Sequence, residues 1–305
     1  MLNLTSVKTI KELLMRHGAR PSKLMGQNFL IDRRVMLKII ESAQLSHNDT
    51  VLEVGPGIGN LTQELAKRAK QVIAVEKDKK MMEILKETLK GYQNIEITNK
   101  DILKLSITNY PTHNAMHSVA GGQLSSYKIV ANIPYYLTSP LIRKFLESDR
   151  PPREMILMVQ KEVAQRICSK PPNMSLLAVS IQFYADPKIV SYVKKESFWP
   201  RPKVDSAILK IVHRMQKSSI RKSFYELMTF DGTNKIGREK FFKIVKAGFA
   251  QPRKQLANNL SKALKKDRSQ ISKWLIANGI NPEQRAETLS LSNWKDLTRT
   301  FDIVN

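Results

Sequence analysis

Cysteine is almost absent from this chain of 305 residues, which contains only Cys168. A single cysteine excludes a disulfide within the chain and favours a reducing compartment. Long apolar runs are also absent, because no stretch reaches the roughly 18 apolar residues that a membrane-spanning helix requires. Residues 1–18 mix apolar and charged side chains, which predicts an amphipathic helix over residues 5–17 and not a signal peptide. We therefore expect a cytoplasmic protein without a membrane partner.

Acidic residues are scarce relative to basic ones. The chain has 51 lysines and arginines against 27 aspartates and glutamates, giving a formal net charge of +24. The excess is densest over residues 214–305, which carry 19 basic and 8 acidic side chains. Nucleic acid, an anionic membrane surface or an acidic protein could balance such a charge, and a solvated surface is the alternative. A charge of this size favours nucleic acid.

Short apolar runs alternate with helical patterns up to about residue 212, after which only helical patterns follow. Such alternation is typical of an α/β fold with a parallel, doubly wound sheet. We predict an α/β domain over residues 1–214 and a small all-helical domain over residues 215–305. Residues 106–127 lack periodicity and are predicted to form an exposed loop. The predicted strands are 51–54, 72–75, 95–98, 128–131, 155–159, 188–193 and 207–212, and the predicted C-terminal helices are 236–249, 254–264, 269–277 and 292–301.

Ligand-binding residue types follow the first three predicted strands. The first runs into EVGPGIGNLT, where Gly55, Gly57 and Gly59 permit a tight turn and close approach of the backbone to a ligand. Glu76 ends the second strand and can accept hydrogen bonds from both hydroxyls of a ribose. Asp101 follows the third and can accept one from an adenine amine. Each feature alone has an ordinary structural explanation, but together they predict a nucleoside site in the crevice at the strand ends.

These motifs resemble the successive cofactor motifs of class I methyltransferases, which use S-adenosylmethionine. Upstream, GQNFLID at residues 26–32 resembles the segment that closes over the methionine part of the cofactor in the rRNA adenine dimethyltransferases. The resemblance implies a Rossmann-like sheet and S-adenosylmethionine as the cofactor. The residues that it implies for the cofactor are Asn28, Leu30, Gly55, Gly57, Glu76, Asp101, Ile102 and Asn132.

The fourth predicted strand runs into NIPYYLTSP, residues 132–140. An exocyclic adenine amine is a poor nucleophile because its lone pair is delocalised into the ring. The side-chain oxygen of Asn132 and the carbonyl of Ile133 can accept its two N–H bonds and orient it, while Pro134 fixes the turn. Tyr135 offers an aromatic face for the base. A helix-capping turn with core tyrosines is the structural alternative. The sequence Asn-Ile-Pro-Tyr resembles the catalytic motif of amino-methylating enzymes.

A later segment, FWPRPKVDSA, resembles an F-x-P-x-P-x-V-x-S pattern of the rRNA adenine methyltransferases. That resemblance implies that Phe198 stacks on the second face of an extruded adenine, and core packing is the alternative. In the tail, Phe249–Leu256 departs from the family's usual basic stretch, since Pro252 and Gln255 replace an arginine and a threonine. Arg253 and Lys254 remain candidate phosphate contacts, against the alternative of solvated helix charges.

The resemblance covers about residues 10–300 and is closer to the KsgA group than to the Erm group. It implies dimethylation of the N6 amine of two adjacent adenines in the 3′-terminal hairpin of small-subunit rRNA, on an immature small ribosomal subunit. We expect no metal site, because His113 and His117 lie in an irregular stretch with no cysteine nearby. We also expect a monomer. An Erm-type methyltransferase of large-subunit rRNA, a non-catalytic rRNA-binding assembly factor and a DNA adenine methyltransferase are the alternatives.

Overall fold

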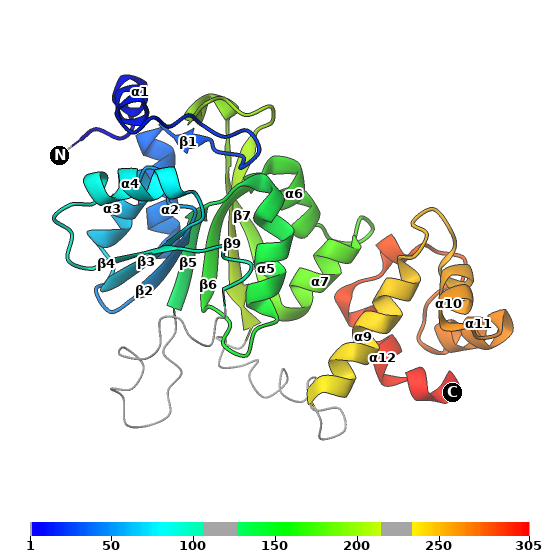
Figure 1. Ribbon diagram of the computed structural model, residues 1–305. Helices are drawn as coiled ribbons and strands as arrows, with labels where there is room; N and C mark the ends of the chain where they lie inside the picture. Colours follow the sequence, from blue (N-terminus) through cyan, green and yellow to red (C-terminus); the bar gives the residue numbers. More distant parts are fainter. Residues whose placement is uncertain (1, 106–126, 215–233, 305) are drawn as a thin grey trace, which may run out of the picture. The chain divides into compact units, whose positions relative to one another are not determined.

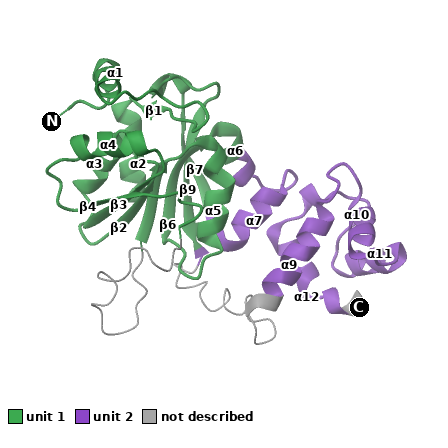
Figure 2. Ribbon diagram, in the orientation of Figure 1, with its two compact units in different colours: residues 1–164, 187–213 green, residues 165–186, 214–305 purple. Residues whose placement is uncertain are grey.

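The computed structural model describes residues 2–105, 127–214 and 234–304, and divides into two compact units (Figures 1 and 2). The first unit contains residues 1–164 and 187–213, and the second contains residues 165–186 and 214–305. Residues 165–186 therefore cluster with the C-terminal helices, although the sequence analysis assigned them to the first domain. The predicted loop, apart from Tyr127, and both His113 and His117 lie outside the described residues.

A seven-stranded sheet with the order β4-β3-β2-β5-β6-β9-β7 organises the first unit (Figure 1). Strands β2 to β6 pair in parallel, as predicted, but β9 runs antiparallel to β6. An apolar run does not reveal strand direction, so the sequence did not indicate that β9 is antiparallel in this otherwise parallel-rich sheet. The strands of this sheet are β2 (Thr50–Val54), β3 (Gln71–Glu76), β4 (Ile95–Asn99), β5 (Tyr127–Asn132), β6 (Glu154–Gln160), β7 (Ala185–Val193) and β9 (Ser206–His213).

The strand order reverses between β2 and β5. From β2 the chain proceeds outward to β3 and β4, and then returns to place β5 on the other side of β2. In open α/β sheets, ligands bind outside the carboxyl ends of the strands at such a reversal. The topology therefore predicts a ligand site at the turns that follow β2 and β5.

Two helices of the first unit begin at aspartates that cap them. Asp32, the last residue of GQNFLID, accepts hydrogen bonds from the N–H groups of Arg34 and Val35 and caps α2. Asp78 caps α4 in the same way through the N–H of Lys80. Carboxylates satisfy the free N–H groups of a first turn. The helices are α1 (Val7–Arg16), α2 (Arg33–Ala43), α3 (Asn60–Ala66), α4 (Lys79–Thr88), α5 (Thr138–Leu146) and α6 (Lys161–Ile167), the last of which runs into the second unit.

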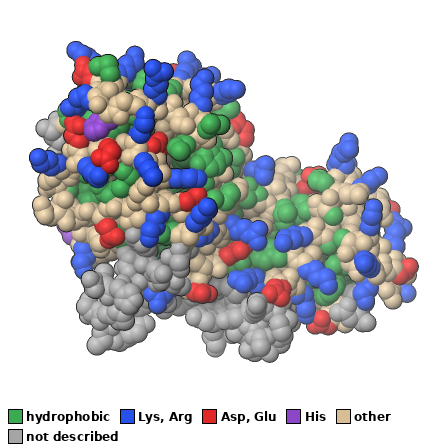
Figure 3. All heavy atoms as spheres, viewed as in Figure 1, with side chains coloured by type: hydrophobic (Ala, Val, Ile, Leu, Met, Phe, Trp, Pro, Cys, Tyr) green, Lys and Arg blue, Asp and Glu red, His purple; other side chains and the backbone are tan. Residues whose placement is uncertain are grey.

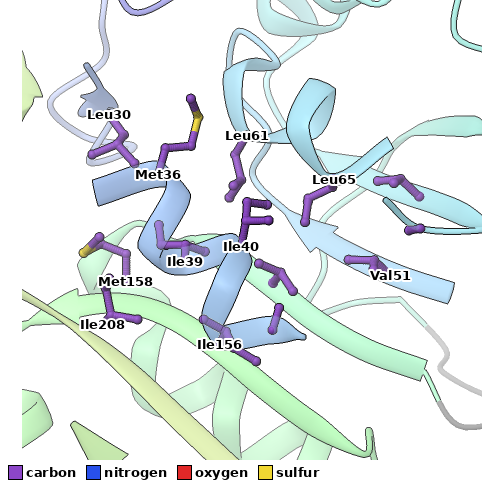
Figure 4. Close-up of a cluster of buried hydrophobic side chains, with 14 of the residues drawn as sticks. Leu30, Met36, Ile39, Ile40, Val51, Leu61, Leu65, Ile156, Met158 and Ile208 are labelled. Carbon is purple, nitrogen blue, oxygen red and sulfur yellow. The ribbon is translucent and has the colours of Figure 1, made fainter. Parts of the chain in front are cut away.

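The main hydrophobic cluster packs α2 against the sheet (Figure 4). Met36, Ile39 and Ile40 recur at helical spacing, so one face of α2 is buried. They meet Leu61 and Leu65 of α3 and residues of β6 and β9, including Met158. This packing fixes the start of α3, and with it the glycine turn that follows β2.

Helices make up most of the second unit. Phe183 of α7 lies 4.4 Å from Phe241 of α9 between ring centroids, which ties residues 165–186 to the C-terminal helices. A Cβ atom on Gly248 would clash with the ring of the fully buried Trp294, so α9 and α12 pack closely there. The helices are α7 (Leu176–Tyr184), α9 (Asn234–Gly248), α10 (Leu256–Leu264), α11 (Arg268–Ala277) and α12 (Leu291–Arg299). Over the described part of the chain, none of the helices is long and apolar enough to cross a membrane.

Candidate active site

A cavity lies at the carboxyl ends of β2, β3 and β5, where the strand order reverses. It brings together residues from the glycine turn, the two strand-end acids, the GQNFLID segment, the NIPYYLTSP turn and the FWPRP segment. Residues that the sequence analysis singled out and that line the cavity are Asn28, Gly55, Gly57, Glu76, Asp101, Ile102, Asn132, Ile133, Pro134, Tyr135 and Phe198.

The glycine turn is held by Glu76. Gly55 and Gly57 have φ values of 68° and 60°, a region in which a side chain is strained. Glu76 Oε2 accepts a hydrogen bond from the N–H of Gly57 at 3.1 Å, and Oε1 accepts one from the N–H of Asp78 at 2.8 Å. Burial raises the pKa of Glu76, and these backbone bonds oppose the rise. A fixed carboxylate thus stands at the end of β3, beside a backbone that has no side chain in the way.

Asp101 forms an ion pair at the cavity wall. Its Oδ2 lies 3.0 Å from Nζ of Lys77, and its Oδ1 accepts a hydrogen bond from the N–H of Leu103 at 3.0 Å. Burial opposes ionisation of Asp101, but the bonds from Lys77 and Leu103 outweigh it and lower its pKa. Asp101 is therefore an ionised acceptor at neutral pH. Lys77 was not predicted from the sequence, although its position directly after Glu76 at a strand end was a usable signal.

Two short segments pair to close one side of the cavity. Strands β1 (Phe29–Leu30) and β8 (Phe198–Trp199) are antiparallel, with Leu30 opposite Phe198. The cavity is lined by Phe29, whereas Leu30 is buried in the cluster of Figure 4. Phe198, directly opposite Leu30, is 3% exposed and belongs to the same buried cluster, and it also lines the cavity. Leu30 is not among the residues that line the cavity, and its contact with the cofactor stays a prediction.

Asn132 connects the turn after β5 to the GQNFLID segment. Its Nδ2 donates a hydrogen bond to the backbone carbonyl of Asn28, at 3.0 Å. Since the amide nitrogen is committed to that carbonyl, Oδ1 is directed away from it and is available to accept. Pro134 lies close to the same segment, because a Cβ atom on Gly26 would be 3.4 Å from Cβ of Pro134.

Tyr135 is held by a residue that the sequence analysis missed. Its hydroxyl lies 2.8 Å from Oγ of Ser206, which is fully buried in β9. Burial raises the pKa of Tyr135, and the bond to Ser206 opposes the rise. Ser206 is the serine of the F-x-P-x-P-x-V-x-S pattern whose phenylalanine is Phe198. The pattern therefore supplies both a cavity wall and a support for the tyrosine ring.

Comparison with known proteins identifies the family. The family model described as ribosomal RNA adenine dimethylase matches residues 19–302. The chain belongs to this family. The dimethylase relatives include a ribosomal RNA small subunit methyltransferase A of Dehalococcoides mccartyi, 44% identical, which covers 94% of this chain and 90% of the relative. A protein of the same name from Geobacillus kaustophilus is 38% identical and covers 95% of this chain and 94% of the relative. The predicted membership of the KsgA group is confirmed.

Solved structures give the same fold. The 23S rRNA methyltransferase ErmE superposes with a TM-score of 0.65 at 27% identity, covering 90% of this chain and all of that chain. A dimethyladenosine transferase from Plasmodium falciparum superposes with a TM-score of 0.66 at 25% identity, covering 89% of this chain and 96% of that chain. The predicted fold class, a Rossmann-like methyltransferase sheet followed by helices, is confirmed.

Arg253 and Lys254 lie in the turn between α9 and α10, and both are exposed. The buried Asn259 holds this turn, since its Nδ2 donates hydrogen bonds to the carbonyls of Gly248 and Gln251. Neither cation belongs to the cavity of the first unit. On the face shown in Figure 3, basic side chains occur on both units. Among the described residues, no cluster of histidine, cysteine, aspartate or glutamate could hold a metal ion.

Proposed function

We propose that this chain transfers methyl groups from S-adenosylmethionine to the N6 amine of two adjacent adenines in the 3′-terminal hairpin of small-subunit rRNA, each twice. The observation that carries the proposal is one cavity that combines the Glu76 and Asp101 acceptors with the Asn132 turn. The relatives named as small-subunit methyltransferases support the choice of rRNA. We propose that the protein acts as a monomer in the cytoplasm and that its substrate is an immature small ribosomal subunit.

The residues present fit S-adenosylmethionine. Glu76 presents a buried carboxylate at the glycine turn, where the hydroxyls of a ribose can approach. Asp101 is held ionised and suits an adenine amine, with the buried Ile102 beside it as an apolar surface for the ring. Asn28 lines the same cavity, and the family resemblance assigns it to the methionine part. When bound, the cofactor supplies an electrophilic methyl carbon on a positively charged sulfur.

Catalysis by the chain consists mainly of positioning. Asn132 Oδ1 and the carbonyl oxygen of Ile133 accept hydrogen bonds from the two N–H groups of the adenine amine, which lets the nitrogen become pyramidal. As the nitrogen gains positive charge, the same two oxygens stabilise it without having to reorganise. The amine is neutral at physiological pH, so no strong base is needed before transfer. Its proton leaves to water once the nitrogen has become cationic.

The target base has to leave its stack to reach the cavity. Tyr135 and Phe198 both line the cavity, and we assign to them the stacking on the extruded base, with Phe198 held by its packing in the buried cluster. Stacking of one base on an aromatic side chain contributes about 1–3 kcal/mol. We assign phosphate contacts to Arg253 and Lys254, which neutralise charge on the RNA and do not read its sequence.

An Erm-type activity on large-subunit rRNA is the second candidate, and the similarity to ErmE favours it. Incubation with immature small subunits and, separately, with large subunits in the presence of labelled S-adenosylmethionine distinguishes the two. We expect label only on two adjacent adenines of the small-subunit hairpin, located by primer extension, and none with the Asn132→Ala variant. Label in large-subunit rRNA would replace the proposal with the Erm reading. Label in neither RNA would overturn both.

A further inference from the structure

Gln27 of the GQNFLID segment makes two side-chain hydrogen bonds at the edge of the cavity. Its Oε1 accepts from the N–H of Ser22 at 2.8 Å, and its Nε2 donates to Oδ2 of Asp78 at 2.9 Å. The backbone N–H of Gln27 also donates to the carbonyl of Ser22, at 3.1 Å. The first and third bonds close residues 22–27 into a compact loop, and the second ties that loop to the turn after β3.

The partner of Gln27 belongs to the turn that carries the proposed ribose acceptor. Asp78 uses its backbone N–H to donate to Glu76 Oε1, at 2.8 Å. Its Oδ1 accepts from the N–H of Lys80 and begins α4, so Oδ2 is the oxygen that Gln27 meets. Gln27 is thus connected to the Glu76 carboxylate through two hydrogen bonds, both of which involve Asp78.

The residues on either side of Gln27 contact the acceptor turn. Gly26 lies against Pro134, and the carbonyl of Asn28 accepts the amide of Asn132 at 3.0 Å. Three consecutive residues of one loop therefore alternate between the two halves of the cavity. The middle one touches the turn after β3, and its neighbours touch the turn after β5.

We propose that Gln27 is a positioning residue that couples the cofactor half of the cavity to the acceptor half. By fixing residues 22–27 to the Glu76–Asp78 turn, it holds the carbonyl of the next residue, Asn28, where it orients Asn132. The role requires a donor and an acceptor at the end of one side chain, which an amide provides and a carboxylate does not at neutral pH. The inference rests on the proposed function, because it assigns the two halves to cofactor and adenine.

Three changes separate this role from simple packing. Gln27→Met has a similar length and makes neither hydrogen bond. Gln27→Glu keeps an acceptor for the N–H of Ser22 but sets a carboxylate against Asp78. Gln27→Glu combined with Asp78→Asn exchanges the amide and the carboxylate, and so restores the bond with its polarity reversed. Asparagine also remains a good cap for α4.

The test measures binding of S-adenosylhomocysteine by calorimetry and kcat for methyl transfer to immature small subunits. We expect about tenfold weaker binding for Gln27→Met, in line with loss of a hydrogen bond to a charged group, and a larger loss for Gln27→Glu. We expect kcat to fall in both, and both quantities to recover in the paired variant. Gln182→Met is the matched control, since the side chain of Gln182 also makes two hydrogen bonds, donated by its Nε2 to the carbonyls of Ile167 and Ser169, but lies outside the cavity.

Hydrogen exchange without any ligand supplies an independent readout. The N–H of Ser22 should exchange faster in Gln27→Met than in the wild type, and circular dichroism should show both folded. Wild-type binding and kcat in Gln27→Met, or no recovery in the paired variant, would overturn the coupling alone. A wild type that does not bind S-adenosylhomocysteine would overturn the proposed function and the coupling with it.

Discussion

The side-chain amide of Asn132 donates a hydrogen bond to the backbone carbonyl of Asn28, across 104 positions of sequence. The bond joins the turn that would hold the target amine to the segment that would cover the cofactor. It also settles which end of the amide faces the cavity, because the nitrogen is used and the oxygen is left to accept. The hydrogen bond from Asn132 to the carbonyl of Asn28 therefore orients Asn132 Oδ1 as an acceptor for the target amine.

Removal of this amide should stop catalysis and spare cofactor binding. In Asn132→Ala, the adenine amine loses one of its two acceptors, and we expect kcat to fall about 100-fold or more, the usual loss for one preorganised hydrogen bond. Single-turnover transfer to immature small subunits measures the fall. S-adenosylhomocysteine binding by calorimetry should stay within about threefold of wild type, a change of about 0.7 kcal/mol or less. A loss of binding equal to the loss of rate would instead make Asn132 a cofactor residue only.

Glu76 should affect cofactor affinity first. Glu76→Ala removes the carboxylate that accepts from Gly57 and Asp78, and with it the proposed acceptor for the ribose hydroxyls. We expect S-adenosylmethionine to bind at least about tenfold more weakly, as befits loss of hydrogen bonds to a charged group. Titration calorimetry gives the affinity directly. Unchanged affinity in a folded variant would remove Glu76 from the site.

Tyr135 and Ser206 should behave as one unit. Tyr135→Phe and Ser206→Ala each break the same 2.8 Å hydrogen bond, so their effects on kcat/KM should not add. We expect each single change to lower kcat/KM severalfold, and the double variant to be no worse than the poorer single one, a coupling of about 1 kcal/mol. Additive losses in this double-mutant cycle would show that the hydroxyl pair does not position the ring.

The strand-end motifs could be predicted from sequence because parallel strands bring their carboxyl ends to one edge. Gly55, Glu76 and Asp101 needed only correct strand boundaries to be placed in one cavity. The support of Tyr135 by Ser206 could not be predicted, since it depends on β9 pairing antiparallel with β6. Strand β1 has only two residues and therefore shows no periodicity, so the sequence could not indicate that Phe29 lines the cavity.

Assignment of residues 165–186 to the first domain failed for a related reason. The sequence LLAVSIQFY of α7 is apolar on all sides, so periodicity does not show which partner it packs against. In the structure, Phe183 and Tyr184 contact the rings of α9. Only these long-range contacts assign the helix to the second unit.

RNA binding should depend on salt through the exposed turn of the second unit. Neutralising one phosphate contact lowers the slope of log affinity against log salt by about one. We therefore expect Arg253→Ala and Lys254→Ala each to reduce the slope by about that amount for small-subunit rRNA, measured by filter binding. Lys90→Ala, at an exposed lysine beyond α4, serves as the control. Slopes equal to wild type in both variants would exclude the two cations from the RNA interface.

Glu53, in the strand before the glycine turn, should make the free protein less stable as pH rises. It is 1% exposed, and its Oε2 has no hydrogen-bond partner among the described residues. Burial raises its pKa from 4.5 to about 8; the nearby Thr62 hydroxyl opposes the rise without forming a well-aligned bond, and the charge of Glu76 adds to it. The folded state therefore retains a proton that the unfolded chain releases.

The sign of the effect follows from this difference. The contribution to stability is complete below the ordinary pKa of 4.5 and is lost as pH rises through about 8. Its full size is about 5 kcal/mol at most, at 1.36 kcal/mol for each pH unit. Urea unfolding of the wild type and Glu53→Gln at about pH 5 and about pH 8.5 should show the variant gaining relative stability at the higher pH, since its amide does not titrate.

Glu64 provides a control of opposite sign. Burial opposes its ionisation, but hydrogen bonds from Lys67 and Arg68 outweigh burial and lower its pKa below 4.5. Its contribution is therefore present above that value and lost only as pH falls below it, so Glu64→Gln should follow the wild type in parallel between about pH 5 and about pH 8.5. If Glu53→Gln also ran parallel to the wild type over this range, Glu53 would be ionised in the folded protein. Its unpartnered oxygen would then need a cation that the buried strand does not supply.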